Sequence, residues 1–149
     1  MFNIKKFNEI NDFLRKTNNS AKIIAISKNH PVDSILEAIN FGVHIFGENR
    51  VQEAQEKFKK IRQNNHKIEL HLTGPLQSNK VKTAIALFDV FHTLDREKIA
   101  REFSKYKDLL KNKKFFLQIN TGKEISKSGI YPEDTKDFLI FLKTEMKLA

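Results

Sequence analysis

The chain has 149 residues and a hydrophobic content of 40%, enough for one core, so we expect residues 1–149 to form a single domain. The absence of cysteine excludes a disulfide scaffold, thiol catalysis and cysteine metal sites, and it fits a reducing compartment. No stretch approaches the length of a membrane span, and the first segment lacks the apolar core of a signal peptide, so we expect a cytoplasmic protein without membrane contact.

The formal net charge of +9 raises the question of nucleic acid, because clustered Lys and Arg release counterions from phosphates. The basic residues are dispersed, however. One group lies at residues 57–62 and another at residues 111–114, and neither carries the interleaved aromatic residues of an RNA-binding module. Sequence-specific binding of nucleic acid is therefore not expected, and a basic scaffold module that binds RNA or acidic partners stays open as an alternative.

Hydrophobic periodicity predicts an amphipathic helix at residues 4–17, followed by a repeated unit of strand, loop and helix. The expected strands span residues 22–27, 44–46, 68–73, 90–94 and 115–120, and the expected helices span residues 31–41, 51–63, 79–88, 97–111 and 132–147. Strands that alternate with helices favour right-handed crossovers and a parallel sheet.

The fold class that follows is a parallel (β/α) barrel. No glycine-rich dinucleotide fingerprint follows the first strand, so a nucleotide-binding doubly wound sheet is less favoured than a barrel of the TIM type. About five βα units are visible in the chain, whereas a closed barrel needs eight. The sequence therefore predicts an incomplete barrel.

Lys28 is the first candidate for a functional side chain. It stands where the apolar run at residues 23–26 gives way to a loop and to Pro31 at the start of a new helix. Reactive groups gather at the carboxyl ends of parallel strands, since the strand fixes the backbone while the loop leaves room for a ligand. An amine that loses hydration there becomes a nucleophile towards aldehydes. The alternative is an ordinary surface lysine in a basic chain.

Polar loops follow the later strands as well, at residues 47–49, 74–80, 93–96 and 120–130. In a parallel sheet these loops would lie at the same edge as Lys28. Each also has a purely structural interpretation: Asn49, Ser78 and Asp95 are all suited to cap helices, although the loop that contains Ser78 could instead bind phosphate. His71 and His92 fall on strands without metal-ligand spacing, so we interpret His71 as a hydrogen-bonded core histidine and expect no metal site.

These segments resemble the alanine-racemase-like barrel proteins of pyridoxal 5'-phosphate (PLP) homeostasis. The matching segments are residues 25–28, 46–54, 71–80, 93–96, 118–120 and 127–129, which occur in order and at family spacing. The resemblance implies the alanine-racemase N-terminal type of barrel, with PLP as the cofactor. It implies that Lys28 forms a Schiff base with the aldehyde of PLP, that Asn49 lies beside the cofactor ring, and that Lys127 is a second amine near the site.

The family function implied in this way is that of a carrier or buffer, with PLP-dependent apoenzymes as potential partners and without expected turnover. An amino-acid racemase or decarboxylase that uses the same Schiff base stays open as an alternative. Such an enzyme needs an acid or a base across the cofactor, for which Lys127 is the candidate that the match supplies.

The chain departs from the family pattern at residues 146–149, where a sixth strand should begin. Family members normally continue through three further strands, which hold a Ser-containing phosphate loop, an Arg that faces the pyridine nitrogen and a Gly-Thr segment. We therefore expect a truncated chain that retains PLP poorly, because hydrogen bonds to charged groups contribute about 1.5–3 kcal/mol each. The first and fifth strands would be open edges, which a homodimer could cover.

Overall fold

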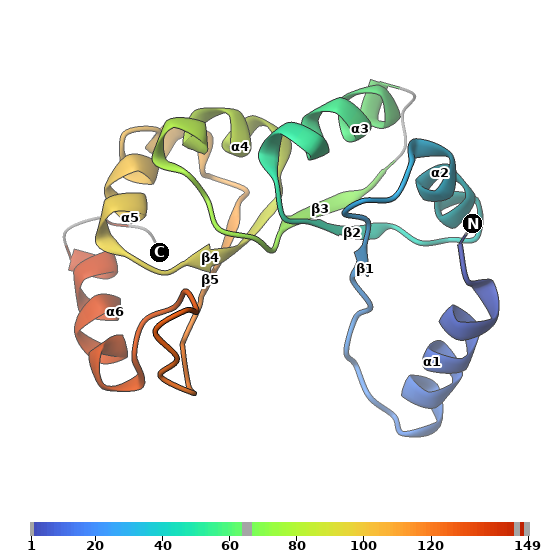
Figure 1. Cartoon of the computed structure of the whole chain (residues 1–149), viewed down its shortest axis with the longest axis horizontal. Helices are drawn as coiled ribbons and strands as arrows, with labels where there is room; N and C mark the ends of the chain where they lie inside the picture. Colours follow the sequence, from blue (N-terminus) through green and yellow to red (C-terminus); the bar gives the residue numbers. More distant parts are fainter. Residues whose placement is uncertain (1, 64–66, 145–146, 148–149) are drawn as a thin grey trace.

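The computed structural model describes residues 2–63, 67–144 and 147, and it centres on a parallel sheet (Figure 1). The strands are β1 (Ala25–Ile26), β2 (Ile45–Glu48), β3 (Glu69–Leu72), β4 (Val90–Leu94) and β5 (Lys114–Leu117). They lie in the order β1-β2-β3-β4-β5, and each is parallel to its neighbour. A doubly wound sheet reverses its strand order at a switch point, whereas a (β/α) barrel winds in one direction. The predicted incomplete barrel is therefore confirmed.

Each strand is followed by a helix. The helices are α2 (Val32–Asn40), α3 (Val51–Gln63), α4 (Val81–Leu87), α5 (Glu97–Ser104) and α6 (Thr135–Thr144), and α1 (Ile4–Lys16) precedes the sheet. Short 3-10 segments lie at Ser78–Lys80, Lys107–Leu109 and Pro132–Asp134. Figure 1 shows α2 to α5 along one face of the sheet, with α1 and α6 at its two ends. No helix among the residues described is long and apolar enough to cross a lipid bilayer.

Several elements are shorter than the sequence predicts. The strand expected at residues 22–27 is reduced to β1, an edge strand that pairs only with β2. The helix expected at residues 97–111 ends at Ser104, because the next amides bond three residues back, as Tyr106 N–H does to the Phe103 carbonyl at 2.9 Å. The last helix ends at Thr144, and residues 145–146 of its predicted span lie outside the described residues.

The hydrophobic core lies between the sheet and its helices. Phe46 of β2 packs against Phe58 of α3, with ring centroids 5.7 Å apart, and Phe91 of β4 packs edge-on against Phe103 of α5 at 4.9 Å. All four rings are buried. Burial of one such side chain stabilises the fold by roughly 1.5–3 kcal/mol, so this layer holds the strands in place.

The opposite face of the sheet carries no covering layer among the residues described. Side chains alternate along a strand, so the residues between the core positions point away from the helices. Ile26 and Gly47 meet there, since a Cβ on Gly47 would lie 2.6 Å from Ile26 Cδ1. On the same face, Phe116 stacks on His92 at 4.9 Å. Ile26 is 47% exposed and Phe116 is 52% exposed. This bare face, which would be the interior of a closed barrel, is open to solvent at Ile26 and Phe116, and β1 and β5 are its open edges.

Candidate functional site

The register between β1 and β2 sets the position of Lys28. Ile26 pairs with Gly47, and the Ser27 amide donates to the Gly47 carbonyl at 2.9 Å. Lys28 and Asn49 stand two positions beyond this pair, at the carboxyl edge of the sheet. Lys28 is exposed, and its amine has no hydrogen-bond or ion-pair partner within the described part of the chain. No contact among the described residues therefore holds the end of the Lys28 side chain.

A buried cluster on the helix side of the sheet holds the backbone on both sides of Lys28. Glu48 is 0% exposed, and its carboxylate accepts hydrogen bonds from Ser27 Oγ at 2.8 Å and from Lys57 Nζ at 3.0 Å. Lys57 Nζ also donates to the Ser27 carbonyl at 2.8 Å and to Glu53 at 2.6 Å. Glu53 also accepts a hydrogen bond from the Asn29 amide at 2.7 Å. Side chains of α3 therefore hold both Ser27 and Asn29, the residues on either side of Lys28.

The electrostatics of this cluster favour the ionised form of Glu53. The hydrogen bond from Lys57 is the largest cause that lowers the pKa of Glu53, and the bond from the Asn29 amide lowers it further. Asn29 adopts a left-handed conformation with φ of 62°, which asparagine tolerates better than most residues. The pairs Glu48 with Ser27 and Glu53 with Asn29 were not predicted from the sequence. Two signals in the sequence point to these pairs: the i,i+4 spacing of Glu53 and Lys57, and the acidic Glu48 inside an apolar strand.

Asn49 lies half-buried at the end of β2. Its side chain makes no hydrogen bond with other described residues, so the alternative of a helix cap does not hold. Gly74 packs directly on its backbone, since a Cβ at Gly74 would lie 2.3 Å from the Asn49 carbonyl oxygen. Only glycine permits this approach, and the contact fixes the loop after β2 against the loop after β3. The backbone of Asn49 is therefore held in place by the loop after β3.

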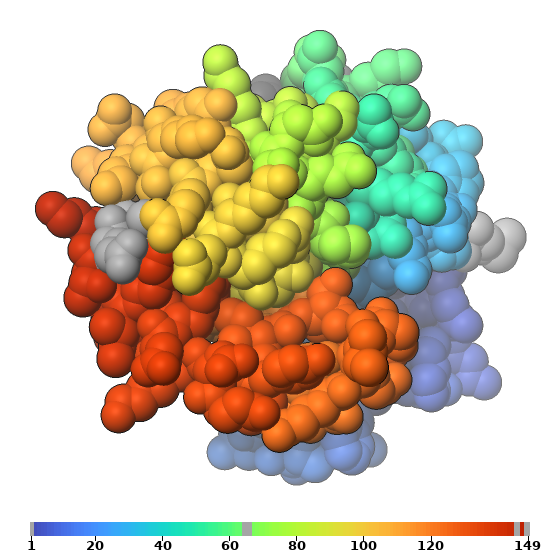
Figure 2. Space-filling model, turned by 60° about the vertical axis from the view of Figure 1, so that its left-hand side comes forward, coloured from blue at the N-terminus to red at the C-terminus, as the bar shows by residue number. Residues whose placement is uncertain are grey.

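Lys127 lies in the long loop after β5, at the opposite edge of the sheet from β1. Its side chain is exposed, and its amide donates to the Glu124 carbonyl at 3.0 Å. Asn120 organises the loop from within by donating to the carbonyl oxygens of Glu124 and Lys127, at 2.8 and 3.4 Å. Figure 2 shows the loop (orange) as an exposed ridge beside α6 (red). The open sheet does not bring Lys127 into contact with Lys28.

A chain of polar side chains crosses the bare face of the sheet. His71 Nε2 lies 2.8 Å from Glu69 Oε1, and His71 Nδ1 lies 2.8 Å from His92 Nε2. A carboxylate only accepts, so His71 donates to Glu69 and, when neutral, accepts from His92. Burial is the first cause that lowers the pKa of His92, and the charge of His71 lowers it further. The hydrogen bond from His71 likewise lowers the pKa of Glu69.

His71 is therefore the buried, hydrogen-bonded histidine that the sequence predicted. Among residues 2–63, 67–144 and 147, no group of three or more His, Asp or Glu side chains is arranged to hold a metal ion.

Two of the predicted helix caps are wrong. Gln77, and not Ser78, precedes the 3-10 segment, and no side chain caps it. Arg96 stands at the start of α5 without a side-chain cap, while Asp95 accepts a hydrogen bond from the Arg96 guanidinium at 2.5 Å. Both predictions fail because these segments leave the sheet as strand-end loops, whose geometry is set by tertiary contacts in place of helix capping.

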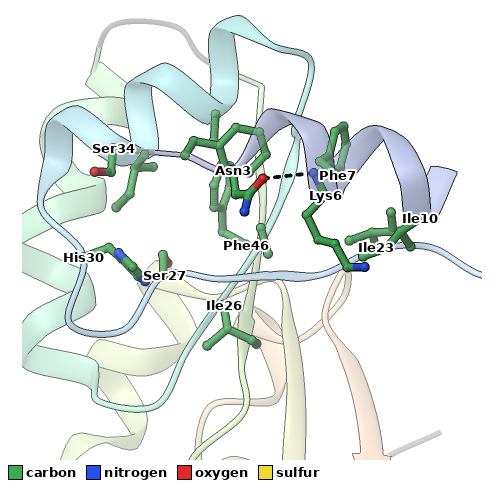
Figure 3. A pocket seen from close by; sticks show the side chains of 14 residues that line it. Asn3, Lys6, Phe7, Ile10, Ile23, Ile26, Ser27, His30, Ser34 and Phe46 are labelled. Atoms are coloured by element: carbon green, nitrogen blue, oxygen red, sulfur yellow. Dashed lines mark hydrogen bonds between the residues drawn. The ribbon is translucent and has the colours of Figure 1, made fainter.

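An apolar cavity of about 350 Å³ lies behind β1, between α1 and α2. Figure 3 shows α1 crossing the segment that leads into β1, with Phe7 and Ile10 near Ile23 and with Ser27 and His30 at the far end. The cavity is lined mainly by apolar side chains. The amine that lines it belongs to Lys6, which is paired with Glu9 at 3.1 Å. The cavity therefore offers little to a phosphorylated ligand.

The chain is similar to proteins of one known family. Residues 6–149 match the family "Alanine racemase, N-terminal domain". The pyridoxal phosphate homeostasis protein of Pasteurella multocida is 41% identical over 124 residues, which are 83% of this chain and 53% of the relative. That of Buchnera aphidicola is 44% identical over 135 residues, which are 85% of this chain and 56% of the relative.

Solved structures of PipY from Synechococcus elongatus match as well. The form with PLP bound gives a TM-score of 0.76 at 33% identity, covering 91% of this chain and 63% of PipY. The form without PLP gives 0.76 at 37% identity, covering 83% of this chain and 58% of PipY. The chain spans about half the length of the curated relatives that it matches. With its strand order, its lysine after β1 and a family match over residues 6–149, this chain belongs to the alanine racemase N-terminal domain family.

Proposed function

We propose that the chain binds PLP through a Schiff base on Lys28 and serves in PLP homeostasis as a carrier or buffer. The observation that carries the proposal is the β1–β2 register: Lys28, whose amine has no partner among the described residues, and Asn49 both stand two positions beyond the paired Ile26 and Gly47. The curated relatives named pyridoxal phosphate homeostasis proteins and the PLP-bound form of PipY support the same function. PLP-dependent apoenzymes are the partners that such a carrier would supply.

The residues present fit the aldehyde end of PLP. PLP supplies an aldehyde that condenses with an amine with loss of water, and a pyridine ring that accepts electrons. On the protein side, Lys28 provides the amine, Asn49 provides a hydrogen-bonding amide beside it, and the Glu48–Lys57 pair holds the turn from behind.

Carrier function is favoured over amino-acid racemisation or decarboxylation. Turnover requires a proton donor or acceptor on the far side of the cofactor. Lys127 is the candidate for this role, yet it lies on an exposed loop after the opposite edge strand. A carrier needs only a reversible bond to one amine, which Lys28 can supply without a second catalytic group.

We further propose that residues 1–149 act as one partial barrel domain. One cluster of buried apolar side chains runs from Ile35 in α2 to Leu142 in α6, which supports a single folding unit. The exposed apolar residues of the bare face, among them Ile26 and Phe116, support pairing with a second copy.

Reduction with borohydride after incubation with PLP tests the proposal, because it converts a Schiff base to a stable amine that peptide mapping can locate. We expect one dominant label at Lys28, saturating with PLP, and its loss in Lys28→Ala. Lys22→Ala is the matched control, since Lys22 is also exposed and lies six positions earlier on the segment that leads into β1. Labelling spread evenly over surface lysines, or undiminished in Lys28→Ala, would contradict the proposal.

A further inference from the structure

A polar pocket of about 540 Å³ lies at the ends of β2, β3 and β4, and Asn49 of the Lys28 site belongs to its lining. Three cationic side chains line it: Arg50 before α3, Lys80 at the end of the Gln77–Lys80 loop, and Arg96 before α5. None of the described residues that line it carries a carboxylate. Each cation follows a different strand, so three separate sequence motifs converge on one cavity whose cations the PLP proposal does not use.

The pocket is built from fixed parts. The Arg96 guanidinium donates to the Leu76 carbonyl at 2.7 Å and to Asp95 at 2.5 Å, and both Leu76 and the Asp95 side chain are nearly inaccessible. A guanidinium held at two of its nitrogens still has N–H groups to donate, at little further entropic cost. The close contact between Gly74 and Asn49 holds the loop after β2 against the loop after β3. These two walls of the cavity therefore lie together without a bound ligand.

The two other cations, Arg50 and Lys80, have no ion-pair partner among the described residues. The charge of Arg50 nevertheless helps to lower the pKa of Glu53. Among the three cations, Arg96 has a counter-charge on Asp95, whereas Arg50 and Lys80 have none among the described residues and repel each other, so the cluster favours occupation by an anion. Arg and Lys together are suited to phosphate, because the planar guanidinium binds two oxygens and the ammonium supplies a point charge.

We propose that this pocket binds the phosphate group of a small organic phosphate, independently of Lys28. The volume lies in the usual range of about 300–1,000 Å³ for small-ligand sites. Val51, Pro75 and Leu76 provide apolar wall for the organic part of the ligand. None of the described lining residues is aromatic, which disfavours a single-stranded nucleic acid, since such ligands stack their bases on aromatic rings.

Titration with phenyl phosphate and with inorganic phosphate, at constant ionic strength, tests the proposal by calorimetry on the 149-residue chain. Neither probe has an aldehyde, so neither can form a bond to Lys28. We expect saturable binding of one equivalent, and affinity at least about tenfold lower in the double variant Arg50→Gln, Lys80→Gln. Tighter binding of phenyl phosphate identifies an organic ester as the ligand, whereas equal affinities would overturn the assignment to an organic phosphate.

The control is the double variant Lys59→Gln, Lys60→Gln, which makes the same change in net charge on the exposed face of α3. Its affinity should equal that of the wild type, and all variants should keep the wild-type unfolding midpoint. An equal loss in both double variants, or no saturable binding in the wild type, would overturn the proposal. Lys28→Ala should retain phenyl phosphate binding while it loses PLP labelling, so failure of one proposal is distinguishable from failure of the other.

Discussion

Replacement of Lys57 by methionine should strongly destabilise the fold, because it removes the counter-charge from a fully buried carboxylate. Lys57 Nζ makes three short contacts, to the Ser27 carbonyl, Glu48 and Glu53, at 2.8, 3.0 and 2.6 Å. Removal of one partner from a buried pair costs about 3–5 kcal/mol. Lys57 retains 11% exposure, so we expect a value near the lower end, about 3 kcal/mol. Domains of this size have total stabilities of about 5–15 kcal/mol, so the loss is a large fraction.

Urea unfolding followed by circular dichroism measures this cost as a change in midpoint at constant slope. The variant Lys59→Met is the matched control: it lies on the same helix, is exposed, and should change stability by less than about 0.5 kcal/mol. Adding Glu48→Gln to Lys57→Met removes the unpaired buried charge of Glu48 and should restore part of the lost stability. A double-mutant cycle measures this effect as a coupling free energy between the two residues. A cost below about 1 kcal/mol for Lys57→Met, or no coupling to Glu48, would refute the argument from buried charge.

Three further outcomes follow from other contacts. Burial holds the pKa of His92 in the folded chain below its ordinary value of 6.5. As pH drops through that value the unfolded chain binds more protons than the folded chain, so the stability of the fold should decrease. In His92→Gln, the urea midpoint should depend less on pH than it does in the wild type. Gly74→Ala should cost about 1–3 kcal/mol in urea unfolding because its Cβ meets the Asn49 carbonyl, whereas Gly122→Ala, whose nearest neighbour is 3.4 Å away, serves as the control and should cost far less. Phe116→Ser should reduce self-association in light scattering more than Phe13→Ser on α1 does, and equal effects would argue against pairing through the bare face.

The architecture could be predicted from the sequence because its signals are local. Alternation of apolar strands with amphipathic helices indicates parallel crossovers, and five such units place the strands in consecutive order. Element lengths were less predictable. The segment at residues 22–24 has the composition of a strand, yet β1 pairs only from Ala25, because an edge strand has one neighbour and its length is set by that neighbour. Tertiary contact, and not propensity, decides where such a strand begins.

The candidate site was predictable only in its outline. A lysine directly after an apolar run indicates a strand-end amine, and the position of Lys28 follows from that pattern. The contacts behind it join residues up to 30 positions apart, as between Lys57 and the Ser27 carbonyl, and no periodicity reports such pairs. The basic pocket is similar in this respect. Arg50, Lys80 and Arg96 each look like isolated surface charges in the sequence, and only the parallel sheet brings them to one cavity.

The two faces of the sheet differ in how they are packed, and we expect them to contribute differently to the site. The helix-covered face contains the Glu48–Lys57 cluster and the aromatic core, so the turn that carries Lys28 is positioned from a layer that is already packed. On the bare face, Ile26 and Phe116 are about half exposed. Under the proposed function, we expect the reactivity of Lys28 to depend on the helix-covered face and the retention of a bound cofactor to depend on how completely the bare face is covered. A chain of this kind should therefore label with PLP at Lys28 and release it readily, and added covering of the bare face should slow the release without moving the label.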